Sequence, residues 1–568
     1  MNTNRNAHIA FLEQELQVQV KSFEETLNTS ASRLLLVENQ MYVAKYIKFR
    51  NDGEMLLKMS NKHKLPRKND YLYAFTVPDS YRSYKNWGNL TYGELIKLKT
   101  AFSEVHCVWY SNSEDENFSL VGMRGVTEEF KKYVETVPGC VMILGPQVPP
   151  FEYLINLQKI IKAGICIETP TDSKSDKLTL IGDNGFDIIK ESIQDNRVTI
   201  LQGPPGTGKT YLIAQLCEYF CNLGKSVMVT ALTNRALMEV ASKPMLRDLL
   251  NKGKIGKTNL TSDEKSELYN LSPIKKLDPV KGYIKLSTYY LTSGYSKDCI
   301  SEHYSKYDIV IMDEASQAFM GMFVAADHIG DKHLWVGDTN QMPPIVLLND
   351  EHIARHGYHP FVDGMTEIVA SKKFPTFQLT YTYRLTPSST NLTSLFYNGT
   401  LKSKNGGMDL EPLLVNMTLE SGNDSPTNGI YFASKLAEEL NTYYPKSTIA
   451  VLSHKIESVK SLQKMLSKQS VSDTKVIVET VARVQGLTVD YTIYFIPKTD
   501  CMIYSLEKRL FNVATSRARI RTIIVADSNI LDYKYKSSIV ESYLRNMKEV
   551  AISDSNYNDI TTIRNLIC

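Results

Sequence analysis

The sequence lacks three patterns that would assign it to common classes of protein. Its eight cysteines are scattered along 568 residues with no CxxC spacing, so neither a zinc module nor a disulfide framework is signalled. No apolar run approaches membrane-spanning length, and the first residues lack a basic-then-apolar signal pattern. We therefore expect no membrane segment and a reducing, cytoplasmic compartment.

An excess of charge of one sign is also missing. The net charge is only +3, from 65 Lys and Arg against 62 Asp and Glu, so any surface for a polyanion has to be local. The apolar content of 43% and charged content of 22% are typical of an ordinary globular protein. A chain of this length exceeds a single core, which predicts about two to four domains.

The first 170 residues predict an accessory domain. Apolar positions recur at helical spacing over residues 8–27, which favours an amphipathic helix. From about residue 33 to 162, short β-branched and aromatic runs alternate with turns such as NDG at 51–53, which indicates a small β-rich domain. Residues 169–177 (TPTDSKSDK) are typical of a polar linker.

After residue 177 the pattern changes to buried strands separated by helices. The first set of apolar runs is RVTIL, SVMVTAL, YDIVIMD and HLWVGD, and the second is TFQLT, TIAVLS, KVIVET, YTIYFI and TIIVAD. Such runs are typical of parallel sheets covered by helices on both faces. We predict two successive α/β units, at residues 171–370 and 371–568. Ligands in these sheets bind beyond the carboxyl ends of the strands.

The octet GPPGTGKT lies between one such strand and an amphipathic stretch. Its backbone N–H groups can converge on phosphate oxygens, and the helix N-terminus adds its positive dipole end. Lys209 can reach the β- and γ-phosphates, and the Thr210 hydroxyl can bind Mg²⁺. A chance glycine-rich turn would not fill every fixed position in this context. The predicted triphosphate site consists of Gly203, Pro204, Pro205, Gly206, Thr207, Gly208, Lys209 and Thr210.

Two further strand ends carry polar groups suited to hydrolysis. In DEASQ, Asp313 is expected to hold Mg²⁺ through water and Glu314 to polarise the attacking water. A DE pair alone is more often a solvated strand end, but its own strand and its place about a hundred residues after the phosphate loop favour catalysis. In GDTNQMPP, Gln341 is suited to contact a γ-phosphate and to report its loss.

The motifs YTYRLTP and NVATSRAR place arginines in the second unit. A cleft between two units needs cations from the far side to neutralise charge on the transferred phosphoryl group, and we predict Arg384 and Arg517 in that role. Arg519 and Arg521 are alternatives if the turn register differs. Tyr383 is expected to stack on the base.

In order and spacing, these motifs together with VARVQGLTVD resemble those of superfamily-one helicases. The resemblance is greatest to the branch containing the nonsense-mediated-decay RNA helicase, senataxin and the nidovirus helicases, and it covers about residues 184 to 527. It implies two tandem RecA-like motor domains preceded by a barrel-like accessory domain, ATP and Mg²⁺ as cofactors, and 5′-to-3′ movement. Gln485 and Gly486 resemble the residues that link the triphosphate site to the strand-binding cleft.

The resemblance also implies residues that grip a nucleic-acid backbone. Their hydroxyl and amide groups suit sequence-neutral phosphate contacts, although such residues are individually commoner as caps or in turns. They are Thr233, Asn234, Ser287 and Thr288 in the first motor unit, and Ser453, His454 and Thr480 in the second.

The sequence departs from the branch at three points. Thr488 stands where Glu is common at the nucleotide sugar, and Asp187 stands where a Gln usually contacts adenine. The preference for ATP over other triphosphates is therefore an expectation from the family alone. The cysteine-rich zinc module of the nidovirus and nonsense-decay members is missing, which disfavours a close orthologue of either.

Three functions fit these motifs to different degrees. The leading hypothesis is an ATP-driven helicase or translocase on single-stranded DNA or RNA, acting as a monomer, with the amino-terminal domain available to protein partners. The alternative is a nucleic-acid-gated ATPase switch that remodels partners without unwinding, for example in a defence or mobile-element system. A ring-forming AAA-type ATPase also carries GPPGTGKT, but arginines within the same chain and the VQGLTVD element disfavour it.

Overall fold

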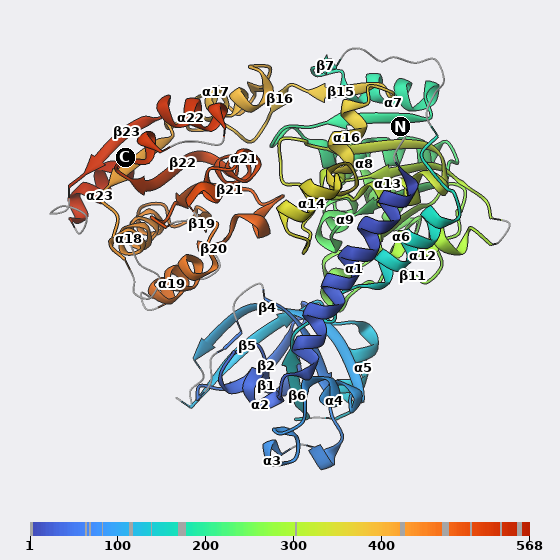
Figure 1. Cartoon of the computed structure of the whole chain (residues 1–568), viewed down its shortest axis with the longest axis horizontal. Coiled ribbons are helices and arrows are strands. Elements are labelled where there is room, and N and C mark those ends of the chain that lie inside the picture. Colours follow the sequence, from blue (N-terminus) through green and yellow to red (C-terminus); the bar gives the residue numbers. More distant parts are fainter. Residues whose placement is uncertain are drawn as a thin grey trace.

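The computed structural model describes residues 4–62, 65–66, 70–81, 83–112, 117–137, 139–168, 178–301, 304–420, 427–467, 476–499, 502–533, 537–553 and 559–567. The predicted linker at 169–177 lies outside them. The chain forms a β-barrel, called here the accessory barrel, and two α/β bodies, the first and second lobes, arranged as separate masses (Figure 1). No helix among the described residues is long and apolar enough to cross a bilayer.

Helix α1 (Arg5–Asn28) confirms the predicted amphipathic helix and begins three residues earlier. The side chain of Asn4 caps it by accepting hydrogen bonds from the backbone N–H groups of Asn6 and Ala7. Its amino-terminal half is buried in the first lobe, where Phe11 contacts Phe319 edge to face at 5.6 Å. The helix then runs down to the barrel (Figure 1), so it joins the two bodies rather than belonging to the accessory domain alone.

The accessory region is a closed antiparallel barrel with strand order β1-β2-β5-β4-β3-β6, as the resemblance implied. The NDG turn joins β1 to β2 in the pairing Phe49↔Met55, and Gly53 takes a φ of +80°. Small helices α2 (Ala31–Leu36), α3 (Tyr84–Trp87), α4 (Tyr92–Lys97) and α5 (Glu128–Glu135) flank the barrel. The strands are β1 (Tyr42–Phe49), β2 (Met55–Ser60), β3 (Tyr71–Thr76), β4 (Ala101–Asn112), β5 (Phe118–Arg124) and β6 (Val141–Gly145).

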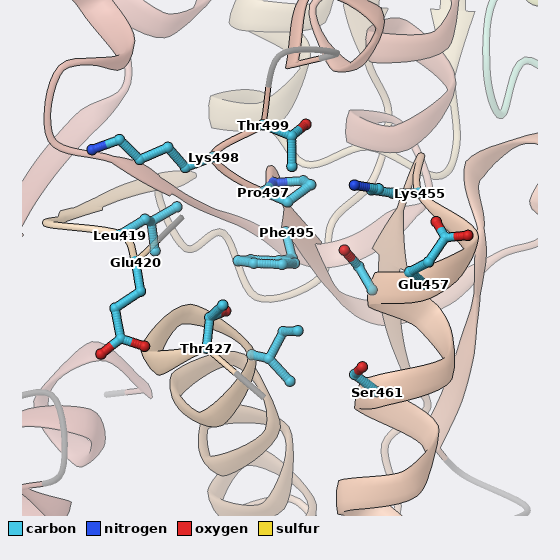
Figure 2. Close-up of a pocket in the computed structure, with 12 residues that line it drawn as sticks. Leu419, Glu420, Thr427, Lys455, Glu457, Ser461, Phe495, Pro497, Lys498 and Thr499 are labelled. Carbon is cyan, nitrogen blue, oxygen red and sulfur yellow. The ribbon is translucent and has the colours of Figure 1, made fainter. Parts of the chain in front are cut away.

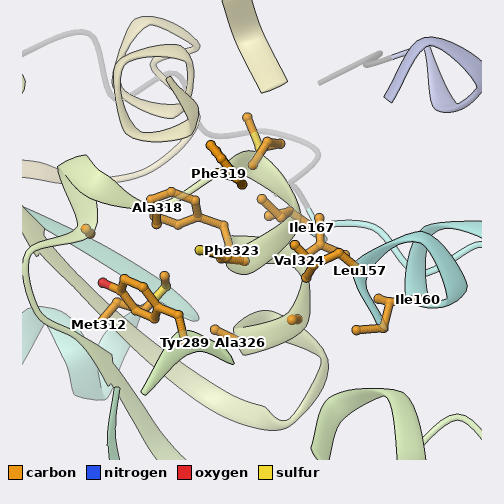
Figure 3. Packing of buried hydrophobic residues seen from close by; sticks show 14 of the residues in the cluster. Leu157, Ile160, Ile167, Tyr289, Met312, Ala318, Phe319, Phe323, Val324 and Ala326 are labelled. Atoms are coloured by element: carbon orange, nitrogen blue, oxygen red, sulfur yellow. The ribbon is translucent and has the colours of Figure 1, made fainter. Parts of the chain in front are cut away.

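Helix α6 (Glu152–Lys162) corrects the expected extent of the accessory domain. The sequence places this segment with the β-rich region, but its apolar stripe packs on α12 (Tyr289–Asp298) and α13 (Met320–His328) of the first lobe. Figure 3 shows Leu157 and Ile160 of α6 beside Val324 and Phe323 of α13. Burial of this stripe against α12 and α13 decides where the helix lies.

The first lobe is built on a nine-stranded parallel sheet in the order β11-β10-β12-β9-β13-β14-β8-β15-β7. Val198 and Ile200 of β8 face one apolar cluster and Leu201 the other, as period-two alternation requires. The strands are β7 (Thr179–Ile181), β8 (Val198–Gln202), β9 (Val227–Ala231), β10 (Ile255–Thr258), β11 (Ser272–Ile274), β12 (Ile284–Thr288), β13 (Tyr307–Met312), β14 (Gly330–Gly337) and β15 (Thr376–Leu379). Its other helices are α7 (Gly185–Asp195), α8 (Lys209–Asn222), α9 (Asn234–Ala241), α10 (Arg247–Asn251), α11 (Ser262–Glu267), α14 (Asp350–His356), α15 (His359–Val362) and α16 (Gly364–Ala370).

Strand β15 is the TFQLT run that the sequence assigns to the second unit. It instead pairs in parallel with β8, with Thr376 opposite Ile200, and with the edge strand β7. The first lobe therefore continues to Leu379 instead of ending at residue 370. The local apolar pattern of this strand would fit the sheet of either lobe. Only its pairing with strands distant in the sequence decides which sheet it joins.

The second lobe carries a six-stranded parallel sheet in the order β20-β19-β21-β22-β18-β23, which confirms the second RecA-like unit. Its strands are β18 (Leu413–Met417), β19 (Ile449–Ser453), β20 (Val476–Thr480), β21 (Val489–Phe495), β22 (Ala518–Asp527) and β23 (Lys548–Ile552). Its helices are α17 (Pro387–Thr393), α18 (Asn428–Tyr443), α19 (Ile456–Ser467), α20 (Met502–Ser505), α21 (Lys508–Thr515), α22 (Ser538–Arg545) and α23 (Ile560–Ile567). A short ladder of β16 (Tyr381–Thr382) and β17 (Lys402–Ser403) connects the lobes.

Candidate nucleoside triphosphate site

The phosphate loop joins β8 to α8. Gly203 donates its N–H to the carbonyl of Gly337 at 2.9 Å, which ties the loop to the end of β14. Gly208 caps α8 with a φ of +82°. The Lys209 ammonium donates to the carbonyls of Gly203 at 2.5 Å and Pro204 at 3.4 Å, so it lies inside the loop. Burial lowers the pKa of Lys209, and the nearby Asp338 and Asp313 carboxylates oppose that shift.

The two acidic residues follow β13 directly. Glu314 has a φ of +53°, a left-handed conformation that turns its side chain away from the strand direction, and its N–H donates to Asp313 Oδ1 at 2.9 Å. Burial raises the pKa of Asp313 to about 6. Burial, followed by the charge of Asp313, raises the pKa of Glu314 to about 7. Two adjacent carboxyl groups of this kind, one buried and one half-buried, are suited to a cation and to proton transfer.

The donor set fits a magnesium ion bound together with phosphates. Thr210 and Asp313 both line the same cleft as the phosphate loop, which offers one hydroxyl and one carboxylate. Among the described residues there is no group of three or more His, Cys, Asp or Glu that would form an all-protein cage. Mg²⁺ needs no such cage, because it keeps waters and takes substrate phosphate oxygens with one or two protein ligands.

Gln341 lies at the junction of the two lobes. Its side-chain amide donates to Asp338 Oδ2 at 2.8 Å, and the same oxygen accepts a hydrogen bond of 2.6 Å from the Tyr397 hydroxyl. Asn512 of α21 donates to Tyr397 Oη at 2.9 Å and to the carbonyl of Asn340 at 2.8 Å. This network makes the predicted phosphate sensor part of the contact between the lobes.

Sequence reasoning did not single out Asp338, Tyr397 or Asn512. Asp338 lies inside the motif GDTNQMPP, whose polar strand end was a usable signal. Tyr397 is one of 33 tyrosines and lies in no motif, so only the fold identifies it.

The segment that carries Arg384 docks on the phosphate loop through its backbone. Thr382 Oγ1 donates to the carbonyl of Pro205 at 2.8 Å, and the N–H of Tyr383 donates to the carbonyl of Gly206 at 2.9 Å. A Cβ atom on Gly206 would come within 2.3 Å of Arg384 Cβ. The glycine is therefore required by this close approach as well as by its φ of +72°.

Both predicted arginines lie where the second lobe meets the first, with Arg517 buried and Arg384 half-buried. Arg384 donates to the carbonyl of Ser516 at 3.1 Å, and Arg517 donates to the carbonyl of Val513 at 2.8 Å. Burial lowers the pKa of Arg384 to about 9 and that of Arg517 to about 10, so both are cationic at neutral pH. Arg519 also lines the cleft, but the alternative Arg521 does not: it donates to the carbonyls of Glu411 and Leu566.

These groups line one cleft of about 290 Å³ between the lobes, close to the size of sites for small ligands. Tyr383, Gln485, Gly486 and Thr488 reach it from the second lobe, whereas the exposed Asp187 forms an ion pair with Lys190 and is absent from its lining. The lining also includes two residues that sequence reasoning missed, Glu239 and Lys243 of the α9 region. The predicted residues that line the cleft are Pro205, Gly206, Thr207, Gly208, Lys209, Thr210, Asp313, Glu314, Gln341, Tyr383, Arg384, Gly486 and Arg517.

The residues predicted to grip nucleic acid all lie at or just beyond carboxyl ends of strands. Thr233 and Asn234 follow β9 and are exposed, and Thr480 ends β20 and is half-buried. The other four are Ser287, Thr288, Ser453 and His454, at the ends of β12 and β19. In each sheet these positions share one edge, because the strands are parallel.

Two of these residues correct the expectation. Ser287 and Ser453 are fully buried, and Ser453 Oγ accepts a hydrogen bond from the N–H of Lys455. Their hydroxyls therefore have no open surface on which to meet a strand. The ring of His454 contacts the Ser505 hydroxyl, and burial lowers the pKa of His454 to about 4, so the ring is neutral at neutral pH.

A small hollow lies at the same edge of the second sheet. Lys455, Glu457 and Ser461 face it from the α19 side, and Thr427, Phe495 and Pro497 also line it (Figure 2). Its volume is about 20 Å³, enough for about one water molecule and too small for a nucleotide. It therefore does not compete with the cleft between the lobes as the triphosphate site.

Comparison with known proteins agrees with this geometry. A family model described as an AAA domain matches residues 187–347. The DNA replication ATP-dependent helicase/nuclease DNA2 of Saccharomyces cerevisiae is 27% identical over 255 residues, which are 43% of this chain and 16% of that protein. The protein of the same name from Schizosaccharomyces pombe is 22% identical over 515 residues, 80% of this chain and 35% of that one.

Similarity to solved structures is weaker. The arterivirus nonstructural protein 10 helicase is 11% identical, with 81% of this chain and 77% of that one covered, at a TM-score of 0.35. A score this low supports no argument about function. This chain spans 35% or less of the length of the two yeast relatives. The AAA domain match and these relatives agree with the resemblance of the ordered motifs to those of superfamily-one helicases.

Proposed function

We propose that this chain hydrolyses ATP and uses the cycle to move along single-stranded nucleic acid as a helicase or translocase. One observation carries the proposal. Lys209 and Glu314 of the first lobe and Arg384 and Arg517 of the second line a single cleft. A triphosphate bound there would touch both lobes, so its hydrolysis would change how they fit together.

The first lobe would bind the triphosphate. The loop N–H groups and Lys209 would hold the β- and γ-phosphates, while Thr210 and Asp313 would hold Mg²⁺. The metal supplies neutralisation of phosphate charge. Binding would also draw the Lys209 ammonium away from the loop carbonyls of Gly203 and Pro204 that it now contacts.

Hydrolysis would then be assisted from both sides of the cleft. Glu314, whose raised pKa suits a general base near neutral pH, would orient and deprotonate the attacking water. Arg384 and Arg517 would neutralise charge that develops on the γ-phosphoryl group. Gln341 would detect the γ-phosphate and transmit its loss through Asp338 to the second lobe.

The strand would follow the carboxyl-end edges of both sheets, where Thr233, Asn234, Thr288, His454 and Thr480 lie. Contacts from hydroxyl, amide and neutral imidazole groups would position a backbone without reading its sequence. Since the yeast relatives are named for DNA replication, we propose single-stranded DNA as the first substrate to test, with RNA as the comparison. Movement from 5′ to 3′ is proposed from the family alone.

The decisive experiment compares the wild-type chain with Lys209→Ala and Glu314→Gln. Hydrolysis of ATP is measured without strand, with single-stranded DNA and with single-stranded RNA, and unwinding is measured on duplexes with 5′ or 3′ tails. We expect strand-stimulated hydrolysis in the wild type and its loss in both variants, with unchanged circular dichroism. Undiminished turnover in either variant would falsify the assignment of the site.

The same experiment separates the alternatives. A nucleic-acid-gated switch would hydrolyse ATP in response to a strand but release none from a tailed duplex. A ring-forming ATPase would need a second copy to supply its arginines. Because Arg384 and Arg517 come from the same chain as Lys209, we propose an active monomer, to be checked by the mass in solution under assay conditions.

A further inference from the structure

Glu15 of α1 is a buried acid whose contacts are made far along the chain. It has no exposed surface, and its carboxylate accepts hydrogen bonds from the backbone N–H of Leu347 at 2.9 and 3.2 Å and from that of Leu348 at 3.0 Å. Gln19, one turn further along α1, donates to the same carboxylate at 2.8 Å. Two backbone amides and one side-chain amide thus satisfy the buried group.

The amides held by Glu15 belong to the segment that carries the proposed phosphate sensor. Leu347 lies six residues after Gln341, and Met342 between them packs against the apolar core of the second lobe. The segment is therefore fastened at Asp338 in the triphosphate cleft, at Met342 on the second lobe and at Leu347 on α1. Because only six residues separate Gln341 from Leu347, the position of Leu347 limits how far Gln341 can move.

Helix α14, which follows the segment, is fastened to α1 as well. Gln14 Oε1 lies 2.6 Å from His352 Nε2. Further along, Phe361 stacks on the ring of His8 at 4.6 Å. The chain from the sensor to α15 thus lies along the amino-terminal half of α1. Of these three contacts, that of Glu15 is made to the residues that follow Gln341 soonest in the sequence.

At its other end α1 is fastened to the accessory barrel. Leu27 packs against the apolar cluster that contains Tyr73 and Tyr92. The carbonyl of Thr29, just beyond the helix, accepts a hydrogen bond from the N–H of Tyr92 at 2.9 Å. With 24 residues the helix is about 36 Å long. It is the element that joins the barrel to the sensor segment (Figure 1).

We propose that Glu15 is a positioning residue for phosphate sensing, which holds Leu347 and Leu348 on α1 and so keeps Gln341 in register with the triphosphate. The inference rests on the proposed function, in which Gln341 contacts the γ-phosphate. Burying a carboxylate that has no cationic partner among these contacts costs free energy, which the hydrogen bonds it accepts must offset. The hydrogen bonds that this carboxylate accepts from the N–H groups of Leu347 and Leu348 fix the position of the segment.

The test compares Glu15→Gln with the matched control Glu13→Gln in the full chain. Glu13 lies on the same helix, is 44% exposed and pairs with Lys162 at 2.8 Å. Two quantities are measured for each protein: kcat and KM for ATP with saturating single-stranded DNA, and amide hydrogen exchange of a peptide covering residues 341–349. A purely structural role of Glu15 would change stability and exchange without a selective effect on kcat.

We expect E15Q to accelerate exchange at Leu347 and Leu348 and to lower kcat about tenfold, with KM for ATP changed less than about twofold. E13Q should match the wild type in both measurements. Faster exchange with an unchanged kcat, or a lower kcat with unchanged exchange, overturns the proposal. If E15Q does not fold, Glu15→Asp keeps the charge on a shorter side chain, and the same two readouts decide.

Failure of this inference is distinguishable from failure of the proposed function. If single-stranded DNA and RNA do not stimulate the wild type or E13Q, the motor function fails. The role of Glu15 is then judged on the unstimulated kcat and on the exchange of the same segment. If stimulation is normal and E15Q behaves as wild type, only the inference about Glu15 fails.

Discussion

The hydroxyl of Tyr397 donates a hydrogen bond of 2.6 Å to Asp338, from the second lobe to the end of β14 in the first. The acceptor is the same oxygen that receives the side-chain amide of Gln341. One carboxylate oxygen thus joins the proposed sensor to the second lobe. Burial, followed by the charge of Asp338, raises the pKa of Tyr397 well above its usual value, so the hydroxyl remains a donor.

Tyr397→Phe should weaken the stimulation of ATP hydrolysis by a nucleic-acid strand more than it weakens unstimulated hydrolysis. The change removes the donor and leaves the ring packing, so we expect a loss of stability of about 1–3 kcal/mol and a fall in strand-stimulated kcat of about tenfold. Unstimulated hydrolysis should change far less. Tyr443→Phe, at a 50% exposed position on α18, is the control. Equal losses with and without strand would show that Tyr397 does not transmit the signal.

Arg517 and Arg519 should differ sharply when each is replaced by Lys. Both line the cleft, but Arg517 is buried at the junction and Arg519 is exposed. Lys cannot reproduce the planar fork of the guanidinium. We expect R517K to lower kcat by about 10³-fold, the lower end of the range for an arginine finger, and R519K to change it less than about threefold. Steady-state hydrolysis at saturating ATP and strand checks this, and a reversed order would move the finger to Arg519.

Gly206→Ala should disrupt the docking of the Arg384 segment on the phosphate loop. The added Cβ would lie 2.3 Å from Arg384 Cβ and 2.7 Å from Thr382 Oγ1. Gly224→Ala is the matched control, because Gly224 has a φ of +76° against +72° at Gly206 but nothing within 4 Å of the added atom. Both variants should lose about 1 kcal/mol from the backbone conformation. Only G206A should also lose affinity for a fluorescent ATP analogue, and equal affinities would argue against the contact.

Docking of α1 should weaken in acid because of His8. Burial lowers the pKa of His8 to about 4 from 6.5. Between these values the unfolded chain binds the proton and the folded chain does not, so the free energy of unfolding falls as the pH decreases. The loss reaches about 2 kcal/mol at about pH 5.

His8→Phe should keep the stacking on Phe361 and remove this loss. Thermal unfolding midpoints at about pH 7.5 and pH 5 should then differ less in H8F than in the wild type. His359→Phe, at an exposed position, is the control. An unchanged pH slope in H8F would mean that other groups dominate the acid response.

The sequence alone was sufficient to place the predicted site residues of the first lobe. The residues of GPPGTGKT and DEASQ are contiguous, so local strand–loop–helix geometry places Lys209, Thr210, Asp313 and Glu314 in relation to their own strands. Parallel strands share their carboxyl-end edge, which brings the two motifs together without further information. The period of the apolar runs was equally informative about the two RecA-like sheets.

The same information was ambiguous for segments that either of two bodies could bury. The apolar runs of α6 and β15 fit more than one neighbour locally, and the structure assigns both to the first lobe. Ser287 and Ser453 have the residue type of phosphate contacts but are fully buried at the ends of their strands. The exposure of a residue at a strand end depends on which distant segments pack against it. A local sequence pattern holds no information about those segments.

Sequence by itself therefore determined which reaction groups the chain carries and on which strand ends they lie, because these depend on neighbours within a few residues. Tertiary structure alone decided how those groups are connected. The bond from Tyr397 to Asp338 spans 59 residues and that from Leu347 to Glu15 spans 332, and neither partner belongs to a repeating pattern. Such pairs meet only because the burial of apolar surface elsewhere brings the lobes and α1 together, and their side chains then satisfy one another inside the contact.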